Sequence, residues 1–243
     1  MSTIKTSGII ISENNFGDYD KMLTMLTPGY GKISCMAKGA RRPKSALLAG
    51  TQFLCFGEYL LYKGANTYNI NSCETIEVFY KLRTDLDKLE YAVKITQIIK
   101  DVVQENQNSY KILQLFLNTL YVISETDKNL ELIYSTFKIK LLCYLGFLPE
   151  IEKCTSCKKK ENLDENINMS YFSLKENGFK CDICSKLDKS CIQMSESTKN
   201  AIRYIVMSPA KKLYSFELKG DALAELNLIS KLYLNDKLEK EYK

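Results

Sequence analysis

The hydrophobic pattern changes once along this chain of 243 residues, near residue 82. Before that point, short apolar stretches alternate with turn residues, which is typical of β-strands. We expect strands over residues 4–12, 19–26, 31–37, 51–62 and 67–78. The turn signal Thr27-Pro28-Gly29 joins the second and third of these as a hairpin. Five short strands this close together predict a small barrel rather than an open sheet.

After residue 82, apolar residues recur every three or four positions, which indicates helices with a buried face. Helices are expected over residues 85–103, 109–123, 130–146, 195–206 and 221–238. Asp85 or Thr84 is a candidate cap for the first helix, and Ser195 for the fourth. A cysteine-rich insert interrupts the helices over residues 153–186, where a short hairpin is expected at 169–180.

The two patterns together predict an α+β chain. A five-stranded β-barrel comes first, and a mainly α-helical domain with an embedded cysteine motif follows it. The expected divisions are the barrel at 1–80, the first part of the helical domain at 81–150, the insert at 151–190 and the last helices at 191–243.

The absence of histidine excludes several kinds of enzyme. A Ser-His-Asp triad, a Cys-His pair and an HExxH zinc site all require that residue. The glycine and lysine spacing of a P-loop is missing as well, so nucleotide hydrolysis by that route is excluded. A binding or scaffolding protein without catalytic residues becomes the leading class.

The sequence also bears on where the chain acts. It contains no apolar stretch of about 18 residues, so no helix is expected to span a membrane. Its first residues lack the apolar segment of a signal peptide. We therefore expect a cytoplasmic protein without a membrane partner.

Two CxxC pairs carry the clearest chemical signal in the chain. They are Cys154 with Cys157 and Cys181 with Cys184, and 23 residues separate them. Four thiolates in two such turns can close a tetrahedron around Zn²⁺ and leave no position open for water. We predict one structural zinc ion per chain. The alternative interpretation is two redox pairs or free thiols. The remaining five cysteines lie mostly within apolar stretches, which favours buried free thiols.

A second signal is a stretch without acidic residues between Asp20 and Glu58. Six basic residues lie in it: Lys21, Lys32, Lys38, Arg41, Arg42 and Lys44. Gly39 and Pro43 bracket the two arginines, which predicts a loop between the third and fourth strands. A cationic loop on a small barrel is suited to nucleic-acid phosphates, and nearby aromatic residues could stack on bases. The candidates for stacking are Tyr30, Phe53, Phe56 and Tyr59; the alternative is that they fill the barrel core.

Several further segments of the chain form a recognisable set. They are Gly8 to Lys21, Leu26-Thr27-Pro28-Gly29-Tyr30-Gly31-Lys32, Ala37 to Ser45 with its Lys-Gly-Ala-Arg-Arg-Pro-Lys core, Gly50-Thr51-Gln52 and Gly57 to Tyr62. Lys140 to Pro149, which leads into the cysteine motif, belongs to the same set. In these segments the chain resembles the RecO family of bacterial recombination mediators, and the resemblance covers essentially its whole length.

This resemblance implies an N-terminal OB-type barrel that binds single- and double-stranded DNA without sequence preference and anneals complementary strands. It implies that the protein acts with RecR, and often RecF, to load RecA on DNA coated by single-strand-binding protein. It also implies that the C-terminal tail of single-strand-binding protein contacts the helical domain. It also implies a cytoplasmic, nucleoid-associated protein. The candidate DNA-binding residues are Lys32, Lys38, Arg41, Arg42 and Lys44.

Two alternatives from other classes stay open. A metal-dependent enzyme acting on nucleic acid needs clustered carboxylates, and Glu13, Asp18 and Asp20 are the densest group near the N-terminus. A zinc-ribbon module that binds proteins would not need the basic loop. Lys138 and Lys140 are weaker candidates for contact with the tail of single-strand-binding protein, beside a stripe containing Phe137 and Leu141 that is expected to pack in the core.

Overall fold

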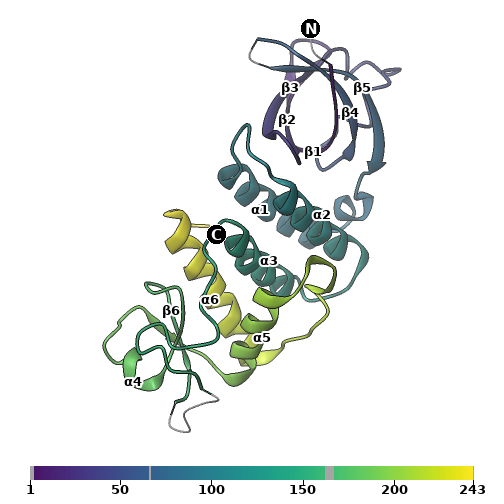
Figure 1. Ribbon diagram of the computed structural model, residues 1–243. Helices are drawn as coiled ribbons and strands as arrows, with labels where there is room; N and C mark the ends of the chain where they lie inside the picture. Colours follow the sequence, from purple (N-terminus) through teal and green to yellow (C-terminus); the bar gives the residue numbers. More distant parts are fainter. Residues whose placement is uncertain (1–2, 66, 162–166, 243) are drawn as a thin grey trace. The chain divides into compact units, whose positions relative to one another are not determined.

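The computed structural model describes residues 3–65, 67–161 and 167–242. The chain divides into two compact units, residues 1–125 and 126–243. The first unit contains a barrel and two helices, and the second contains helices of 15, 12 and 19 residues, one short helical turn and a small sheet (Figure 1). No helix in the described ranges combines the length and the apolar character that crossing a membrane requires.

The N-terminal strands form a closed barrel in the order β1-β2-β3-β5-β4. All neighbouring strands pair antiparallel except β3 and β5, which pair parallel and close the barrel. The predicted five-stranded, OB-type barrel is therefore confirmed. The strands are β1 (Thr3–Phe16), β2 (Asp20–Thr27), β3 (Gly31–Ala37), β4 (Phe56–Lys63) and β5 (Tyr68–Glu77).

Strand β3 shows why the alternating pattern predicts its bounds correctly. Ile33, Cys35 and Ala37 are buried in the barrel, while Ser34 and Met36 between them are partly exposed. This period of two is what a strand with one buried face requires. The same barrel core takes in Ile10, Leu23, Met25, Tyr59, Leu61 and Ile70 from the other strands.

The predicted strand over residues 51–62 is wrong in its first part, because β4 begins only at Phe56. Residues 51–55 form turns instead. Leu54 adopts a left-handed conformation with φ of 62°, its N–H donates to the Ile10 carbonyl at 2.8 Å, and the Ile10 N–H donates to the Cys55 carbonyl at 3.0 Å. The segment is apolar because it closes over strand β1, where a bulge interrupts pairing with β2 between Ile10 and Ser12.

Two helices complete the first unit: α1 (Leu86–Val102) and α2 (Tyr110–Glu125), after a short 3₁₀ turn, η1 (Tyr80–Arg83). The side chain of Asp85 accepts a hydrogen bond from the Lys88 N–H at 3.0 Å, so the predicted cap is confirmed. The end of α1 is tied to the barrel at β3. There the Lys32 N–H donates to the Gln104 carbonyl at 3.2 Å.

Gly31 is required at this junction, and we expect Gly31→Ala to weaken the fold. Its φ is 65°, and a Cβ there would lie 2.1 Å from the Gln104 carbonyl oxygen. Strain of this kind costs about 1–3 kcal/mol before the backbone clash is relieved. The measurement is the midpoint of denaturant unfolding. Gly29→Ala is the matched control, because no atom lies within 4 Å of a Cβ at that position. Equal midpoints for the two variants would contradict the prediction.

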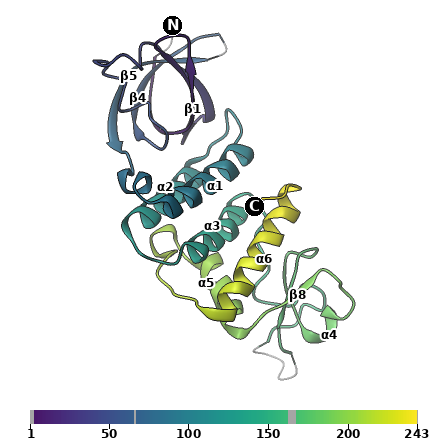
Figure 2. The ribbon, with the colours of Figure 1, turned by 180° about the vertical axis from the view of Figure 1, so that it is seen from behind.

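The second unit is built on α3 (Leu130–Tyr144), α5 (Glu196–Met207) and α6 (Gly220–Leu238), with a 3₁₀ turn, η2 (Ala210–Lys212), between the last two. Helix α3 packs beside α6, as the reverse view in Figure 2 also shows. Ser195 caps α5 by accepting a hydrogen bond from the Thr198 N–H, as predicted.

Helix α3 is buried on almost every side, which confirms core packing for Phe137 and Leu141. It also corrects the interpretation of Lys138 and Lys140, whose side chains are buried. The Lys140 amine donates to three carbonyls at the end of α5, those of Ile205, Val206 and Ser208, at 2.7–3.1 Å. These lysines therefore have structural roles in the helical core.

The cysteine-rich insert contains a small sheet in the order β7-β6-β8 and one helical turn, α4 (Asp182–Ser185). The expected hairpin is confirmed as β6 (Tyr171–Ser173) and β7 (Gly178–Lys180). Strand β8 (Cys191–Gln193) was not predicted, because a strand of three residues carries no detectable period. Phe172 joins the sheet to α6 through an edge-on contact with Tyr233 at 5.1 Å between ring centres.

Candidate nucleic-acid interface and metal site

Four of the five candidate DNA-binding residues lie on one exposed loop after β3. They are Lys38, Arg41, Arg42 and Lys44, and all are exposed; we call residues 38–44 the basic loop. Backbone turns shape it: the Arg42 N–H donates to the Gly39 carbonyl at 3.1 Å, and the Ser45 N–H to the Arg42 carbonyl at 2.9 Å. Gly39 adopts a φ of 66°, which only glycine reaches without strain.

The basic loop is held against the tip of the β1–β2 hairpin. The carboxylate of Asp20 accepts a hydrogen bond from the Gly39 N–H at 2.7 Å. The Arg41 N–H donates to the Tyr19 carbonyl at 2.9 Å, and its guanidinium to the Gly17 carbonyl at 3.2 Å. The guanidinium of Arg42 lies 5.3 Å from the centre of the Tyr19 ring. A loop anchored in this way presents its cations in a defined arrangement.

Lys32 lies apart from the basic loop, at the opposite end of β3. It lies five positions before Ala37, which is about 17 Å along a strand. Its amine donates to the Lys100 carbonyl at 2.6 Å, in the last turn of α1. A cation at the carboxyl end of a helix is favourably placed. Lys32 thus joins the barrel to the helix.

Lys21, the remaining base of this stretch, is also engaged. Its amine lies 2.7 Å from the Glu13 carboxylate and donates to the Thr51 carbonyl at 3.2 Å, and the side chain is only 11% exposed. The local excess of positive charge is therefore concentrated in the basic loop.

Of the aromatic residues considered for base stacking, one is buried in the barrel core and three are partly exposed. Tyr59 is buried, and its hydroxyl donates to the Gly50 carbonyl at 2.7 Å. Base stacking is therefore wrong for Tyr59, and core packing is right. Tyr30 packs against the same core and is partly exposed, as are Phe53 and Phe56. The exposed rings near the basic loop are instead Phe16 and Tyr19, at the tip of the β1–β2 hairpin, and the sequence pattern does not single them out.

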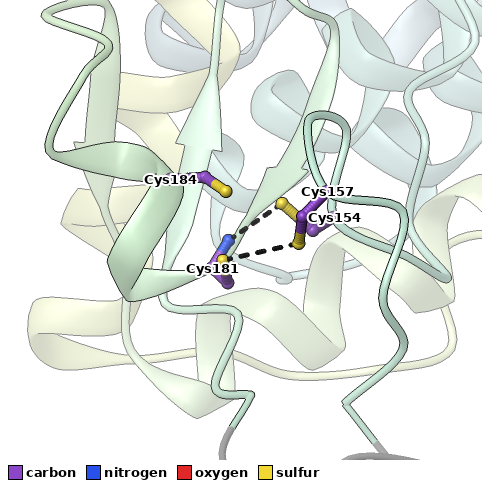
Figure 3. A group of neighbouring side chains, drawn as sticks. All are labelled: Cys154, Cys157, Cys181 and Cys184. Atoms are coloured by element: carbon purple, nitrogen blue, oxygen red, sulfur yellow. Dashed lines mark hydrogen bonds between the residues drawn. The ribbon is translucent and has the colours of Figure 1, made fainter.

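The four predicted metal ligands converge from two turns of the insert. The sulfur atoms of Cys154, Cys157, Cys181 and Cys184 all lie within 4.8 Å of one another. They point toward a common centre in Figure 3. The sulfurs of Cys157 and Cys181 are 3.9 Å apart. Bonds of about 2.3 Å from Zn²⁺ to four sulfurs place those sulfurs ~3.8 Å apart, so the cluster fits a tetrahedral metal ion.

The backbone prepares the first turn for this role. Burial disfavours a thiolate at Cys154, but the N–H groups of Cys181, Cys157 and Ser156 outweigh it and lower the pKa of Cys154 to about 7. Burial, reinforced by the neighbouring Cys181 and Cys157 thiols, raises the pKa of Cys184 to about 12. Four crowded thiols cannot all ionise by themselves, and a divalent cation removes this obstacle. The donor set is therefore consistent with a structural metal.

Two buried lysines, Lys180 and Lys199, form ion pairs in and beside the insert. Lys180, next to Cys181, lies 2.7 Å from Asp188 and 2.6 Å from Glu176. Glu161 lies 2.5 Å from Lys199 and 3.1 Å from Arg203, both on α5. The Lys180 pairs lie within the insert, and the Glu161 pairs join the insert to α5.

The other cysteines lie elsewhere. Cys35 and Cys55 are buried in the barrel, and Cys73, Cys143 and Cys191 are partly buried. Burial raises the pKa of Cys35 to about 12 and those of Cys143 and Cys191 to about 11, so these thiols are unreactive near neutral pH.

Two of the carboxylates that a nuclease would need make structural contacts around the β1–β2 hairpin. Glu13 pairs with Lys21, and Asp20 holds Gly39 of the basic loop. Within the described ranges, the four cysteines form the single group of three or more Cys, Asp or Glu residues with metal-binding spacing.

Comparison with known proteins agrees with both halves of this structure. The family described as "Recombination protein O N terminal" matches residues 1–79, and "Recombination protein O C terminal" matches residues 83–243. A protein of Acetivibrio thermocellus named "DNA repair protein RecO" is 43% identical over 242 residues, covering 100% of this chain and 94% of its own.

Two further relatives bear the same name. The protein of Alkaliphilus metalliredigens is 32% identical, with 98% of this chain and 94% of its own covered. The protein of Clostridium perfringens is also 32% identical, with coverages of 93% and 89%. Family matches to both parts of the chain, and relatives along its whole length, lead to one conclusion: the chain belongs to the RecO family of DNA repair and recombination proteins.

Proposed function

We propose that this chain is a non-enzymatic mediator of recombinational repair that binds single- and double-stranded DNA and anneals complementary strands. The observation that carries the proposal is the basic loop. Lys38, Arg41, Arg42 and Lys44 are all exposed, and no acidic residue lies between Asp20 and Glu58 in the sequence. Such a loop neutralises phosphates whatever the base sequence.

Annealing follows from the same electrostatics. Two DNA strands repel each other through their phosphates, and bound cations reduce that repulsion. When the basic loop neutralises phosphates on both strands, complementary bases meet more often and pair. No catalytic residue is needed, because base pairing supplies the free energy.

The family also supplies the partners in this proposal. With RecR, and often RecF, the chain would help to load RecA on DNA coated by single-strand-binding protein. The C-terminal tail of single-strand-binding protein would contact the helical domain. The place of action would be the nucleoid in the cytoplasm. Membership in a family of DNA repair proteins supports these assignments.

We further propose that the four-cysteine cluster holds one structural Zn²⁺ ion per chain. Cys154, Cys157, Cys181 and Cys184 would supply all four ligands, so the ion would stabilise the insert and would not activate water. The metal would fix the two turns relative to each other.

A strand-annealing assay tests the function directly. We expect the chain to accelerate pairing of two complementary labelled strands, and to leave the strands uncut when Mg²⁺ is present. The variant Arg41→Glu with Arg42→Glu is expected to anneal more slowly. Metal-dependent cleavage that is absent from a matched inactive preparation would favour the nuclease alternative. Unchanged annealing by the charge-reversed variant would contradict the role of the basic loop.

A further inference from the structure

The tip of the β1–β2 hairpin exposes two aromatic rings beside the basic loop. Phe16, the last residue of β1, is 54% exposed, and Tyr19, just before β2, is 51% exposed. The pair flanks the Gly17-Asp18 turn. Exposed aromatic residues are common singly, but two on one tip next to a cluster of cations form a distinct surface. We call these two rings the aromatic step.

Hydrogen bonds fix the hairpin tip to the basic loop. The Asp20 carboxylate and the Tyr19 carbonyl accept hydrogen bonds from the backbone of Gly39 and Arg41 at 2.7 and 2.9 Å. The Arg42 guanidinium lies over the Tyr19 ring at 5.3 Å. Phe16 pairs with Asp20 in the register of β1 and β2, so it lies on the same tip. A phosphate bound by these cations would therefore bring its base close to the tip.

We infer that Phe16 and Tyr19 stack on unpaired nucleobases and so make this surface prefer single strands. Aromatic rings beside a cationic groove bind the faces of bases, and every base offers such a face. In a duplex these faces are covered by the neighbouring base pairs, so the step has little to bind there. The inference rests on the proposed binding of DNA, and adds that bases as well as phosphates are contacted.

The charge on the surface selects this occupant over an apolar protein segment. Lys38, Arg41, Arg42 and Lys44 are all exposed on the loop that is hydrogen-bonded to this tip. An apolar segment would leave these cations without partners, whereas each nucleotide of a nucleic-acid strand offers both an anionic phosphate and the apolar face of a base.

Equilibrium binding to three labelled probes of equal length tests the inference. The probes are a thymidine strand, an abasic strand with the same phosphates, and a duplex. Phe16→Ala with Tyr19→Ala is expected to weaken binding of the thymidine strand by 10-fold or more, since each stacked ring contributes about 5- to 150-fold. Binding of the abasic strand and the duplex is expected to change less than about 2-fold, with the salt dependence unaltered.

Matched variants separate stacking from folding. Tyr19→Phe keeps the ring and is expected to bind as the unchanged chain does, whereas Phe16→Leu with Tyr19→Leu keeps the bulk and is expected to lose affinity. Tyr110→Ala with Tyr121→Ala removes two rings on α2 that are 58% and 56% exposed, and is expected to have no effect. Circular dichroism reports whether each variant is folded.

The outcomes distinguish this inference from the proposed function. If the aromatic variants bind the thymidine strand as tightly as the unchanged chain, or lose affinity for the abasic strand equally, stacking is overturned while binding of DNA stands. If the unchanged chain binds neither the thymidine strand nor the abasic strand, the proposed function fails and this inference fails with it.

Discussion

Replacing Cys181 by serine is expected to remove the metal and to unfold the cysteine-rich insert. Cys181 would contribute one ligand of the proposed zinc site, and its backbone N–H also donates to the Cys154 sulfur at 3.5 Å. Structural Zn²⁺ binds zinc-finger peptides with about 10–16 kcal/mol at neutral pH, and that binding free energy is folding free energy. The strands of the insert have only three residues each, and the packing of Phe172 and the ion pairs of Lys180 and Glu161 are its other supports, so loss of the metal is expected to weaken it strongly.

Metal analysis, thiol titration and thermal unfolding measure this effect. We expect one zinc per unchanged chain, four additional reactive thiols when a strong chelator is added, and an early melting transition in Cys181→Ser. Cys191→Ser is the matched control, since Cys191 lies on β8 of the same small sheet and outside the cluster. It is expected to keep its zinc. An unchanged chain that folds fully without metal would contradict the assignment of the four cysteines.

Replacing Lys38, Arg41 and Arg42 by alanine is expected to weaken DNA binding about 100-fold at 0.1 M salt. Each phosphate contact contributes about 0.7 to the slope of log affinity against log salt for single strands. Three contacts therefore contribute about 2 to this slope. Their contribution to affinity vanishes near 1 M salt, so at 0.1 M salt, a tenfold lower concentration, they raise the affinity about 100-fold. The three side chains are exposed, so their removal is expected to leave the barrel folded.

The loss in the triple variant is expected to be the same for every DNA sequence, because the cations meet phosphates and not base edges. Lys211→Ala with Lys212→Ala is the matched control: it removes two exposed lysines on η2, outside the barrel. It is expected to bind DNA as the unchanged chain does. A loss confined to certain sequences would indicate base readout and would contradict a phosphate contact.

Local patterns predicted much of this fold correctly. Strand β3 was predicted to the residue, since its alternation of buried and partly exposed positions is a property of the strand alone. The starts of α1 and α5 follow from Asp85 and Ser195, whose caps involve residues only three positions away. The four cysteines were predictable for the same reason, because each CxxC pair forms its own turn.

The errors occurred where distant parts of the chain meet. Residues 51–55 look like a strand, but their hydrogen bonds go to the turns around them and to Ile10. Tyr59 occupies a strand position whose period does not show which face is inside the barrel. Lys140 looks exposed in a helical repeat, but α3 is surrounded, and the lysine finds its partners on α5. The docking of the hairpin tip on the basic loop is likewise a tertiary contact, so the sequence pattern does not predict that Phe16 and Tyr19 lie near the basic loop.

The most direct test of the basic loop is a salt titration of DNA binding, with the unchanged chain and the Lys38, Arg41 and Arg42 triple-alanine variant measured side by side. Affinity for one labelled single strand is followed over about 0.05 to 0.3 M salt, and the slope of log affinity against log salt is compared. We predict that the slope of the variant is shallower by about 2. Equal slopes and equal affinities would contradict the claim that this loop holds the DNA.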